Sequence, residues 1–374
     1  MTFLAQGNPT QLEKYFNIAD IIAKGETALA TEPYHITSDI AQYSQGGSQD
    51  FYSNGDFWWP NPNTPDGLPF VQWDGETNPG NFTAHRKSMR NMRTCTAHLA
   101  AAYHITGDEK YAAKAVDFLQ VFFLNPATKM NPHLLYAQAI PGVCHGRGIG
   151  IIDTLHLVDV PVAIEKLKNS PHMSPDIYHG LQQWFSQYLH WITTHPQGIE
   201  EMNHPNNHGV CWNVQAAMFA KFTNNTEVMA LCRTRYKEVY LPEQLAADGS
   251  FPAEIKRTKP YNYSCFTADN MANICHILST EADNLWIFTL PDGRGIKTAI
   301  EYITPFIFNI DTWPHHQDVQ YFDAFPAAFP FLLFAGLAYG REDYLQLWET
   351  LSQKPQGEEL RRNIAIRQAY NWVV

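Results

Sequence analysis

Hydrogen-bonding side chains are concentrated in residues 201–215, EMNHPNNHGVCWNVQ. Amide and imidazole groups both donate and accept hydrogen bonds, and imidazole also exchanges protons near neutral pH. One interpretation is a helix cap, in which Asn206 or Asn207 accepts from the first backbone N–H groups of a helix over 210–222. The other interpretation is a reaction centre, and the pattern alone leaves both open.

Two clusters of cations could bind an anionic substrate. They are HRKSMRNMR at 85–93 and EIKRTK at 254–259. A solvated helix face or loop is the simpler explanation of either cluster taken alone. The whole chain carries a formal charge of −11, and nucleic-acid backbones require a basic surface. The sequence therefore predicts no nucleic-acid partner but remains compatible with a locally bound anion.

The histidines do not form a metal-binding motif. His204 and His208 have H-x-x-x-H spacing, but Pro205 disfavours the helix that would place both rings on one face. His315 and His316 are adjacent, and the chain has neither H-E-x-x-H nor a zinc-type Cys/His set. We therefore predict no catalytic metal and no cofactor.

Helical periodicity dominates the chain, and many of the predicted helices are joined by short turns, which favours antiparallel neighbours. The predicted ranges are 11–28, 86–104, 109–124, 150–168, 175–194, 210–222, 227–240, 265–278, 296–308, 324–339, 343–351 and 357–370. GDEKYAAKAVDF from Gly107 and GREDYLQLWETL from Gly340 open with glycine, acidic residues and tyrosine at matching offsets. This echo predicts repeated helical hairpins arranged as a ring, in a single domain over 1–374.

Three long irregular segments interrupt the helices, at 52–82, 125–150 and 245–264. Such loops in a compact domain are functional or disordered, and their aromatic residues argue against disorder. Aromatics make up 13% of the chain, with 10 Trp and 18 Tyr, and sugar-binding clefts are one use for such rings.

The remaining features concern the cell compartment. The six cysteines have no regular spacing, which indicates buried free thiols. The N-terminus lacks a basic region followed by an apolar one, and no apolar run reaches membrane-spanning length. As it stands, the sequence predicts a cytoplasmic protein without a membrane partner, or a periplasmic or secreted one if a leader was removed.

Four motifs, in order, resemble the alginate lyase superfamily and especially polysaccharide lyase family 38. They are WWPNPNTPDGLPFVQWDGETNP, NPATKMNPHLLYAQAIPGVCHGRGIGIIDT, NNHG and DGSFPAEIKRTKPYNYS, within residues 51–270. The resemblance implies an all-α fold, an incomplete (α/α) toroid, that cleaves uronic acid polymers by β-elimination.

By position, the asparagine and histidine of the family fall on Asn207 and His208, its arginine on Arg257 and its catalytic tyrosine on Tyr263. The sequence departs from the alginate lyases of family 5. Gly209 stands where that family has serine, and Arg257 and Tyr263 are six positions apart, one fewer than in family 5. These differences affect the identity of the polymer more than the reaction.

The residue types suit this chemistry. Elimination from a 4-linked uronide removes the proton at C5, beside a carboxylate that must be neutralised as charge develops. Asn207 and Arg257 can donate to that carboxylate, the guanidinium through its bidentate fork. Tyr263 can act as base and acid if nearby cations such as Arg257 lower its pKa. His208 is an alternative base, or it holds the substrate and tunes the tyrosine.

Further residues are candidate contacts for an anionic polysaccharide or oligosaccharide. Trp58 and Trp59 could stack on sugar rings or fill the core. The other candidates are Gln138, His145 and Arg147 in one loop and, as a subsite cation at the start of helix 86–104, Arg86.

Two other classes remain open. A toroidal glycoside hydrolase needs two carboxylic acids, for which Asp248, Glu254 and Asp269 are available. A polysaccharide-binding protein without catalysis is the second. For the lyase, the similarity to family 38 favours glucuronan or mannuronate-rich alginate as substrate.

Overall fold

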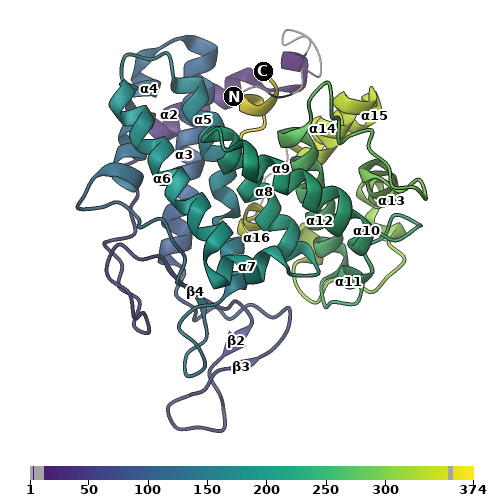
Figure 1. The fold of residues 1–374 in the computed structure, drawn as a ribbon, viewed down its shortest axis with the longest axis horizontal. Helices are drawn as coiled ribbons and strands as arrows, with labels where there is room; N and C mark the ends of the chain where they lie inside the picture. The colour runs from purple at the N-terminus through teal and green to yellow at the C-terminus, as the bar shows by residue number, and fades with distance from the viewer. Residues whose placement is uncertain (1–2, 4–11, 353–356) are drawn as a thin grey trace. The chain divides into compact units, whose positions relative to one another are not determined.

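The computed structural model describes residues 3, 12–352 and 357–374. These residues form two compact units, one of Ile18–Glu201 and one of Met202–Val374 with the described part of Met1–Asn17. Helices dominate both units, and the strands of the described chain are short (Figure 1). The predicted all-α class is therefore confirmed, whereas the single domain over 1–374 stays a prediction.

The unit Ile18–Glu201 is built around one long helix. Helix α3 (Ala84–Thr106) packs against α2 (Ile18–Leu29), α4 (Glu109–Leu119) and α5 (Asp159–Leu167) (Figure 1). The unit also contains α6 (Pro175–Thr194) and most of α7 (Pro196–Met202). Both methionines of α3 and its alanines after Ala84 are fully buried, which lets the neighbouring helices approach closely.

The second unit is built around α8 (Asn207–Phe222) and α12 (Pro260–Leu278), which pack against each other. Helix α8 also contacts α9 (Thr226–Arg235), and α12 contacts α13 (Ile296–Phe308) and α14 (Pro330–Tyr339). The other helices are α10 (Leu241–Gln244), α11 (Pro252–Ile255), α15 (Glu342–Ser352), α16 (Glu358–Asn363) and α17 (Tyr370–Val373). Nearly all of α12 is buried, so its residues are enclosed on every face.

The sequence echo marks two helical hairpins, one in each unit. Gly107 ends α3 with φ 67° and Gly340 ends α14 with φ 65°, both in the left-handed region that glycine adopts without steric cost. Helices α4 and α15 then begin within a few residues. The predicted hairpins are confirmed at both places.

Helices α4 and α9 both end in a wider π-helical turn, at Gln120–Leu124 and Tyr236–Tyr240. The predicted helices over 109–124 and 227–240 therefore have the right extent. By contrast, the helix predicted over 150–168 is wrong in its first half, since Gly148–Val158 is 3-10 helix. A Cβ on Gly150 would lie 2.6 Å from Cβ of Ala137, so this segment packs more tightly against its neighbour than an ordinary helix could.

Other predicted helix boundaries also differ from the structure, and α14 begins at Pro330 instead of 324. Helix α12 begins at Pro260 instead of 265, which places Tyr263 in its first turn and not in a loop. The range 357–370 contains α16 and only the start of α17. Gln11, the predicted start of the first helix, lies outside the described residues, and α2 begins at Ile18.

The long segments carry the short strands. Strand β1 (Tyr52–Asn54) pairs in parallel with β4 (Tyr136–Ala139), and β2 (Trp58–Trp59) pairs antiparallel with β3 (Val71–Gln72). All six cysteines are free thiols, and four of them are buried. Within the described ranges, no helix has the length and apolar character needed to cross a membrane.

Candidate functional site

Helix α8 begins at the polar segment that opened the sequence analysis. The side chain of Asn206 accepts a hydrogen bond from the backbone N–H of His208 at 3.1 Å and caps the helix. The helix-cap interpretation is therefore confirmed, with Asn206 as the capping residue. Asn207 is the first residue of the helix itself, so its side chain is available for a different partner.

The turn before α8 is held by side chains from α9 and the segment after it. Arg235 Nη2 donates to the Met202 carbonyl at 2.7 Å, and so does the Tyr240 hydroxyl at 2.7 Å. Gln244 Nε2 donates to the Asn206 carbonyl at 3.0 Å. These bonds fix the backbone path that leads into Asn207.

Gly209 lies where this turn approaches the protein interior most closely. A Cβ at this position would be 2.4 Å from the His204 carbonyl oxygen and 2.8 Å from the Tyr240 ring. Any larger residue would clash with the His204 carbonyl oxygen, a backbone atom that could give way only if the whole turn moved. The difference from the serine of family 5 therefore has a local steric cause in this chain.

A buried carboxylate holds Asn207. Glu254 Oε1 accepts from the Asn207 backbone N–H at 2.8 Å, and Oε2 accepts from Asn207 Nδ2 at 2.9 Å. Glu254 is 1% exposed and Asn207 is 4% exposed. Burial raises the pKa of the Glu254 carboxyl, while the two bonds from Asn207 and the charges of Arg257 and His208 act in the opposite direction. Asn207, His208 and Arg257 thus all act on one carboxylate.

Arg257 and Tyr263 lie on either side of the start of α12. The Arg257 guanidinium carbon is 4.7 Å from the centroid of the Tyr263 ring, within the range of a cation–π contact. The backbone N–H of Arg257 donates to the Glu254 carbonyl at 3.0 Å. The structure therefore brings the four predicted catalytic residues into one cluster in the unit Met202–Val374.

A loop distant in sequence holds this part of the chain. Asp318 accepts from the backbone N–H groups of Tyr261 at 2.9 Å and Asn262 at 3.0 Å, which lie in the first turn of α12. A ring nitrogen of His316 lies 3.1 Å from the Arg257 carbonyl oxygen. Burial raises the pKa of Asp318 to about 6. The loop thus supplies the cap that α12 lacks locally.

His204 adds a neutral imidazole to the cluster. Its ring centroid lies 5.0 Å from that of His208. Burial, followed by the charges of His208 and Arg257, lowers the pKa of His204 to about 4, although a hydrogen bond with the Asn206 side chain opposes this. His204 is therefore neutral at pH 7. The described residues contain no group of three or more His, Cys, Asp and Glu placed to hold a metal ion.

The tryptophan candidates lie in the unit Ile18–Glu201. Both are partly buried in β2, and Trp58 has the Arg147 guanidinium carbon 5.8 Å from its ring centroid. The Trp59 ring lies 4.9 Å from that of Trp73, which is 44% exposed. Trp73 lies beside Trp59 and adds its ring to the proposed stacking surface. It was missed in the sequence because no signal separates it from the other aromatic residues of the loop.

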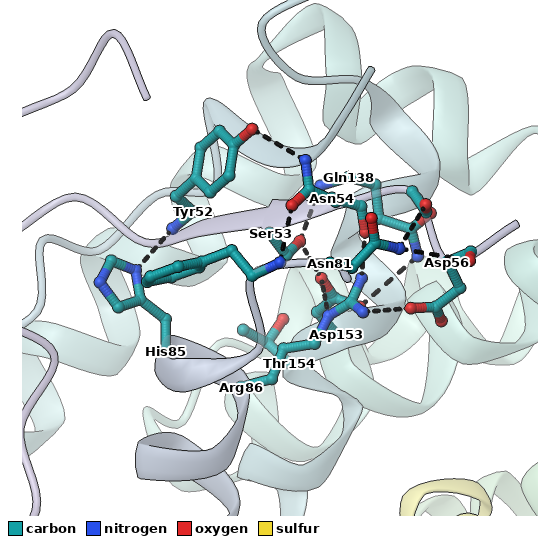
Figure 2. Close-up of polar contacts among 12 residues, drawn as sticks. Tyr52, Ser53, Asn54, Asp56, Asn81, His85, Arg86, Gln138, Asp153 and Thr154 are labelled. Carbon is teal, nitrogen blue, oxygen red and sulfur yellow. Dashed lines mark hydrogen bonds and ion pairs between the residues drawn. The ribbon is translucent and has the colours of Figure 1, made fainter. Parts of the chain in front are cut away.

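Arg86 lies at the centre of a buried polar network (Figure 2). Its guanidinium forms ion pairs with Asp56 and with Asp153, the latter at 3.0 Å from Nε, and Nη2 donates to the Asn54 carbonyl at 2.8 Å. Two carboxylates thus share its single positive charge, which gives Arg86 an internal role that the sequence did not indicate. Its contact with substrate stays a prediction.

Gln138 and Arg147 contact each other. Arg147 Nε donates to the Gln138 carbonyl at 2.9 Å and Nη2 to Gln138 Oε1 at 3.2 Å. Gln138 has φ 49°, an uncommon conformation for a residue other than glycine, and its backbone N–H donates to Ser53 Oγ at 2.8 Å. His145 is exposed in the same loop. Strained residues of this kind cluster at functional sites, but the contacts of these three residues with substrate stay predictions.

The carboxylic acids considered for a hydrolase are poorly placed for that reaction. Glu254 is enclosed beside Asn207, and Asp269 is 0% exposed, accepting from the Phe331 backbone N–H at 2.9 Å. Asp248 is exposed and accepts from the Ser250 backbone N–H. Two of the three therefore could not reach a scissile bond without repacking.

Comparisons with known proteins identify the family and the fold class. The family model described as alginate lyase matches residues 36–313. The crystal structure of an alginate lyase from Bacteroides ovatus is similar, with 32% identity, a TM-score of 0.84 and coverage of 94% of this chain and 92% of that one. Alginate lyase A1-III from Sphingomonas species A1 gives 15% identity, a TM-score of 0.56 and coverage of 91% and 95%. No curated protein matches. These likenesses confirm the (α/α)-toroid fold class.

Proposed function

Because the chain belongs to the alginate lyase family and is a polysaccharide lyase, we propose that it cleaves 4-linked uronic acid polymers by β-elimination. The observation that carries the proposal is the cluster in which Glu254 joins Asn207 to the segment with Arg257, whose guanidinium lies 4.7 Å from the Tyr263 ring centroid. This cluster holds donors for a carboxylate beside a group that can transfer a proton.

Tyr263 is the proton-transfer group in this proposal. Its phenolate takes the proton from C5, the released electron pair forms the C4=C5 double bond, and the C4–O bond breaks. The same proton then passes to the departing glycosidic oxygen, which restores the phenolate. The Arg257 guanidinium beside the ring stabilises the phenolate electrostatically. One side chain thereby acts first as base and then as acid.

Arg257 and Asn207 neutralise the uronate carboxylate. As the C5 proton leaves, negative charge spreads onto this carboxylate, and fixed donors stabilise it more in the transition state than in the ground state. Removal of one such donor costs about 10²–10³ in kcat in other enzymes. The proposal assigns a charged donor to Arg257 and a neutral one to Asn207.

The use of a single tyrosine as both base and acid also suggests the polymer. In 4-linked D-mannuronate and D-glucuronate, the C5 proton and the C4 oxygen leave from the same face of the ring, so one group can serve both. In L-guluronate they leave from opposite faces, which requires a second base, and His208 would have to supply it. We therefore favour mannuronate-rich alginate or glucuronan over polyguluronate.

The unit Ile18–Glu201 contains separate candidate contacts for sugars. Trp58, Trp59 and Trp73 offer aromatic faces for sugar rings. The Gln138–Arg147 pair and His145 offer donors for hydroxyl or carboxylate groups. In this proposal Arg86 chiefly holds the segment of Asn54 and Asp56 that leads into Trp58 and Trp59.

The test is a panel of polymannuronate, polyguluronate, glucuronan and neutral polysaccharides, with ultraviolet absorbance of the unsaturated product as the readout. We expect absorbance to increase with polymannuronate or glucuronan and little change with polyguluronate. Reducing ends that form without this absorbance would mean hydrolysis and would refute the proposal. Polyguluronate as the best substrate would refute the single-tyrosine mechanism alone.

A further inference from the structure

An asparagine amide can face a carboxylate in two ways, and only one of them is favourable. Its two ends are similar in shape, but the NH₂ end attracts an anion and the carbonyl end repels it. A loosely held Asn207 would present either end. Its proposed role beside a substrate carboxylate therefore requires a device that selects the NH₂ orientation.

Glu254 provides that selection. An ionised carboxylate only accepts hydrogen bonds, so the atom of Asn207 that lies 2.9 Å from Oε2 is the nitrogen. The second bond, from the Asn207 backbone N–H to Oε1 at 2.8 Å, prevents rotation of the carboxylate. Because the amide is planar, fixing one N–H of Nδ2 also fixes the direction of the other.

The backbone around Glu254 is fixed as well. Its N–H donates to the Phe251 carbonyl at 3.0 Å, and its own carbonyl accepts from Arg257 at 3.0 Å. The segment that orients Asn207 is thus the one that leads into Arg257. The two proposed donors for the substrate carboxylate are held relative to each other through this one residue.

We infer that Glu254 is a positioning residue, whose carboxylate holds the Asn207 amide so that the remaining N–H of Nδ2 faces the uronate carboxylate. This inference rests on the proposed function. In this inference Glu254 does not touch the substrate, because both of its carboxylate oxygens already accept from Asn207 and its side chain is buried. Its effect on the rate passes through Asn207.

The experiment is a double-mutant cycle with Glu254→Gln and Asn207→Ala. The glutamine keeps the shape of Glu254 but replaces one acceptor with a donor, so the amide of Asn207 loses its fixed orientation. We expect kcat to fall by about 30-fold, because misplacement by about 1 Å can cost 10²-fold. KM should stay near the wild-type value, since the lost contact strengthens in the transition state.

The cycle separates positioning from general damage. In the Asn207→Ala background, Glu254→Gln should change kcat by less than a factor of about two, because the group it orients is gone. Losses that multiply, or a wild-type kcat in Glu254→Gln, would overturn the inference. Glu243→Gln, a change of the same type at an exposed glutamate of α10, is the matched control and should leave kcat unchanged.

A second variant covers misfolding. If Glu254→Gln does not fold by circular dichroism, Glu254→Asp replaces it, since aspartate keeps the charge but cannot reach both donors. We expect Glu254→Asp to lower kcat as much as Glu254→Gln would, and to have no such effect in the Asn207→Ala background. If the losses of Glu254→Asp and Asn207→Ala multiply, the inference is again overturned. Failure of the proposed function would look different, because wild-type protein would then give no unsaturated product from any polyuronate.

Discussion

At the scale of single residues, the proposed mechanism depends on the hydroxyl of Tyr263. Tyr263→Phe keeps the ring that the Arg257 guanidinium contacts but removes the proton-transferring atom. We expect kcat to fall by at least about 10²–10⁴-fold, the usual contribution of a general acid or base, with binding of oligosaccharide largely retained. His208→Ala should cost less. Steady-state rates and calorimetric binding test this, and a larger loss in the histidine variant would contradict the assignment.

Arg257 offers a second test at this scale. Arg257→Lys keeps the charge but replaces a planar fork with a point ammonium on a shorter reach. We expect kcat to fall by about 10²-fold, as for other lost transition-state donors. Lys256→Arg, the neighbouring exposed position, is the control. An unchanged kcat in Arg257→Lys would rule out bidentate recognition.

At the scale of elements, the first turn of α12 depends on a residue far along the chain. Asp318 accepts two backbone N–H groups there, from Tyr261 and Asn262. Asp318→Ala would leave both buried donors without this acceptor, so we expect it to destabilise the protein by about 1–3 kcal/mol. Activity should fall as well, because Tyr263 lies in the same turn. Asp311→Ala, at an exposed aspartate, is the control in urea unfolding, and equal stability of the two variants would refute the capping role.

The elements also show what the sequence could reveal. Most helices follow from periodicity, and the Asn206 cap and the Gly107 and Gly340 hairpins follow from local signals. Tyr263 was expected in a loop because proline and polar residues precede it. Its helix is capped by a side chain more than fifty positions away, which no local pattern records.

In the candidate site too, some residues could be predicted from the sequence, whereas the partners that hold them could not. The order of the motifs predicted Asn207, His208, Arg257 and Tyr263 as site residues. The partners that hold them, Glu254 and Asp318, act through hydrogen bonds between segments 47 and 57 positions apart. Arg86 is similar, since its sequence context suggested an exposed cation, while its partner Asp153 comes from another part of the chain. Residue types are visible in a sequence, but pairings across the fold are not.

At the scale of the whole molecule, buried Asp269 makes stability depend on pH. Burial raises the pKa of Asp269 from its ordinary 3.8 to about 7. Between about pH 4 and 7, the folded state therefore keeps a proton that the unfolded chain has already released. The stabilisation that this bound proton gives is present at low pH and is lost as the pH rises through about 7. The slope is at most about 1.4 kcal/mol per pH unit.

The neutral variant Asp269→Asn isolates this effect. We expect the unfolding free energy of wild type, relative to the variant, to fall as the pH rises from 5 to 8 in urea titrations. Parallel stability curves for the two proteins would show that Asp269 does not titrate in this range.

Because of the Arg86 network, the backbone need not be continuous through the loop between β2 and β3. The segments on the two sides of this loop are hydrogen-bonded to each other. Asn81 Nδ2 donates to the Gly55 carbonyl at 3.1 Å, and Asn78 Nδ2 donates to the Trp58 carbonyl at 2.9 Å. Arg86 also pairs with Asp56 and so joins the first segment to α3. A protease site inserted between Asn63 and Thr64 should be cut without separating the fragments, as exposed loop tips tolerate such changes. Denaturing gels would show two bands and gel filtration one peak. Arg86→Met should lower the melting temperature of the cut chain far more than that of the uncut chain. Equal decreases would mean that the peptide bond, and not the buried guanidinium, keeps the two ends in place.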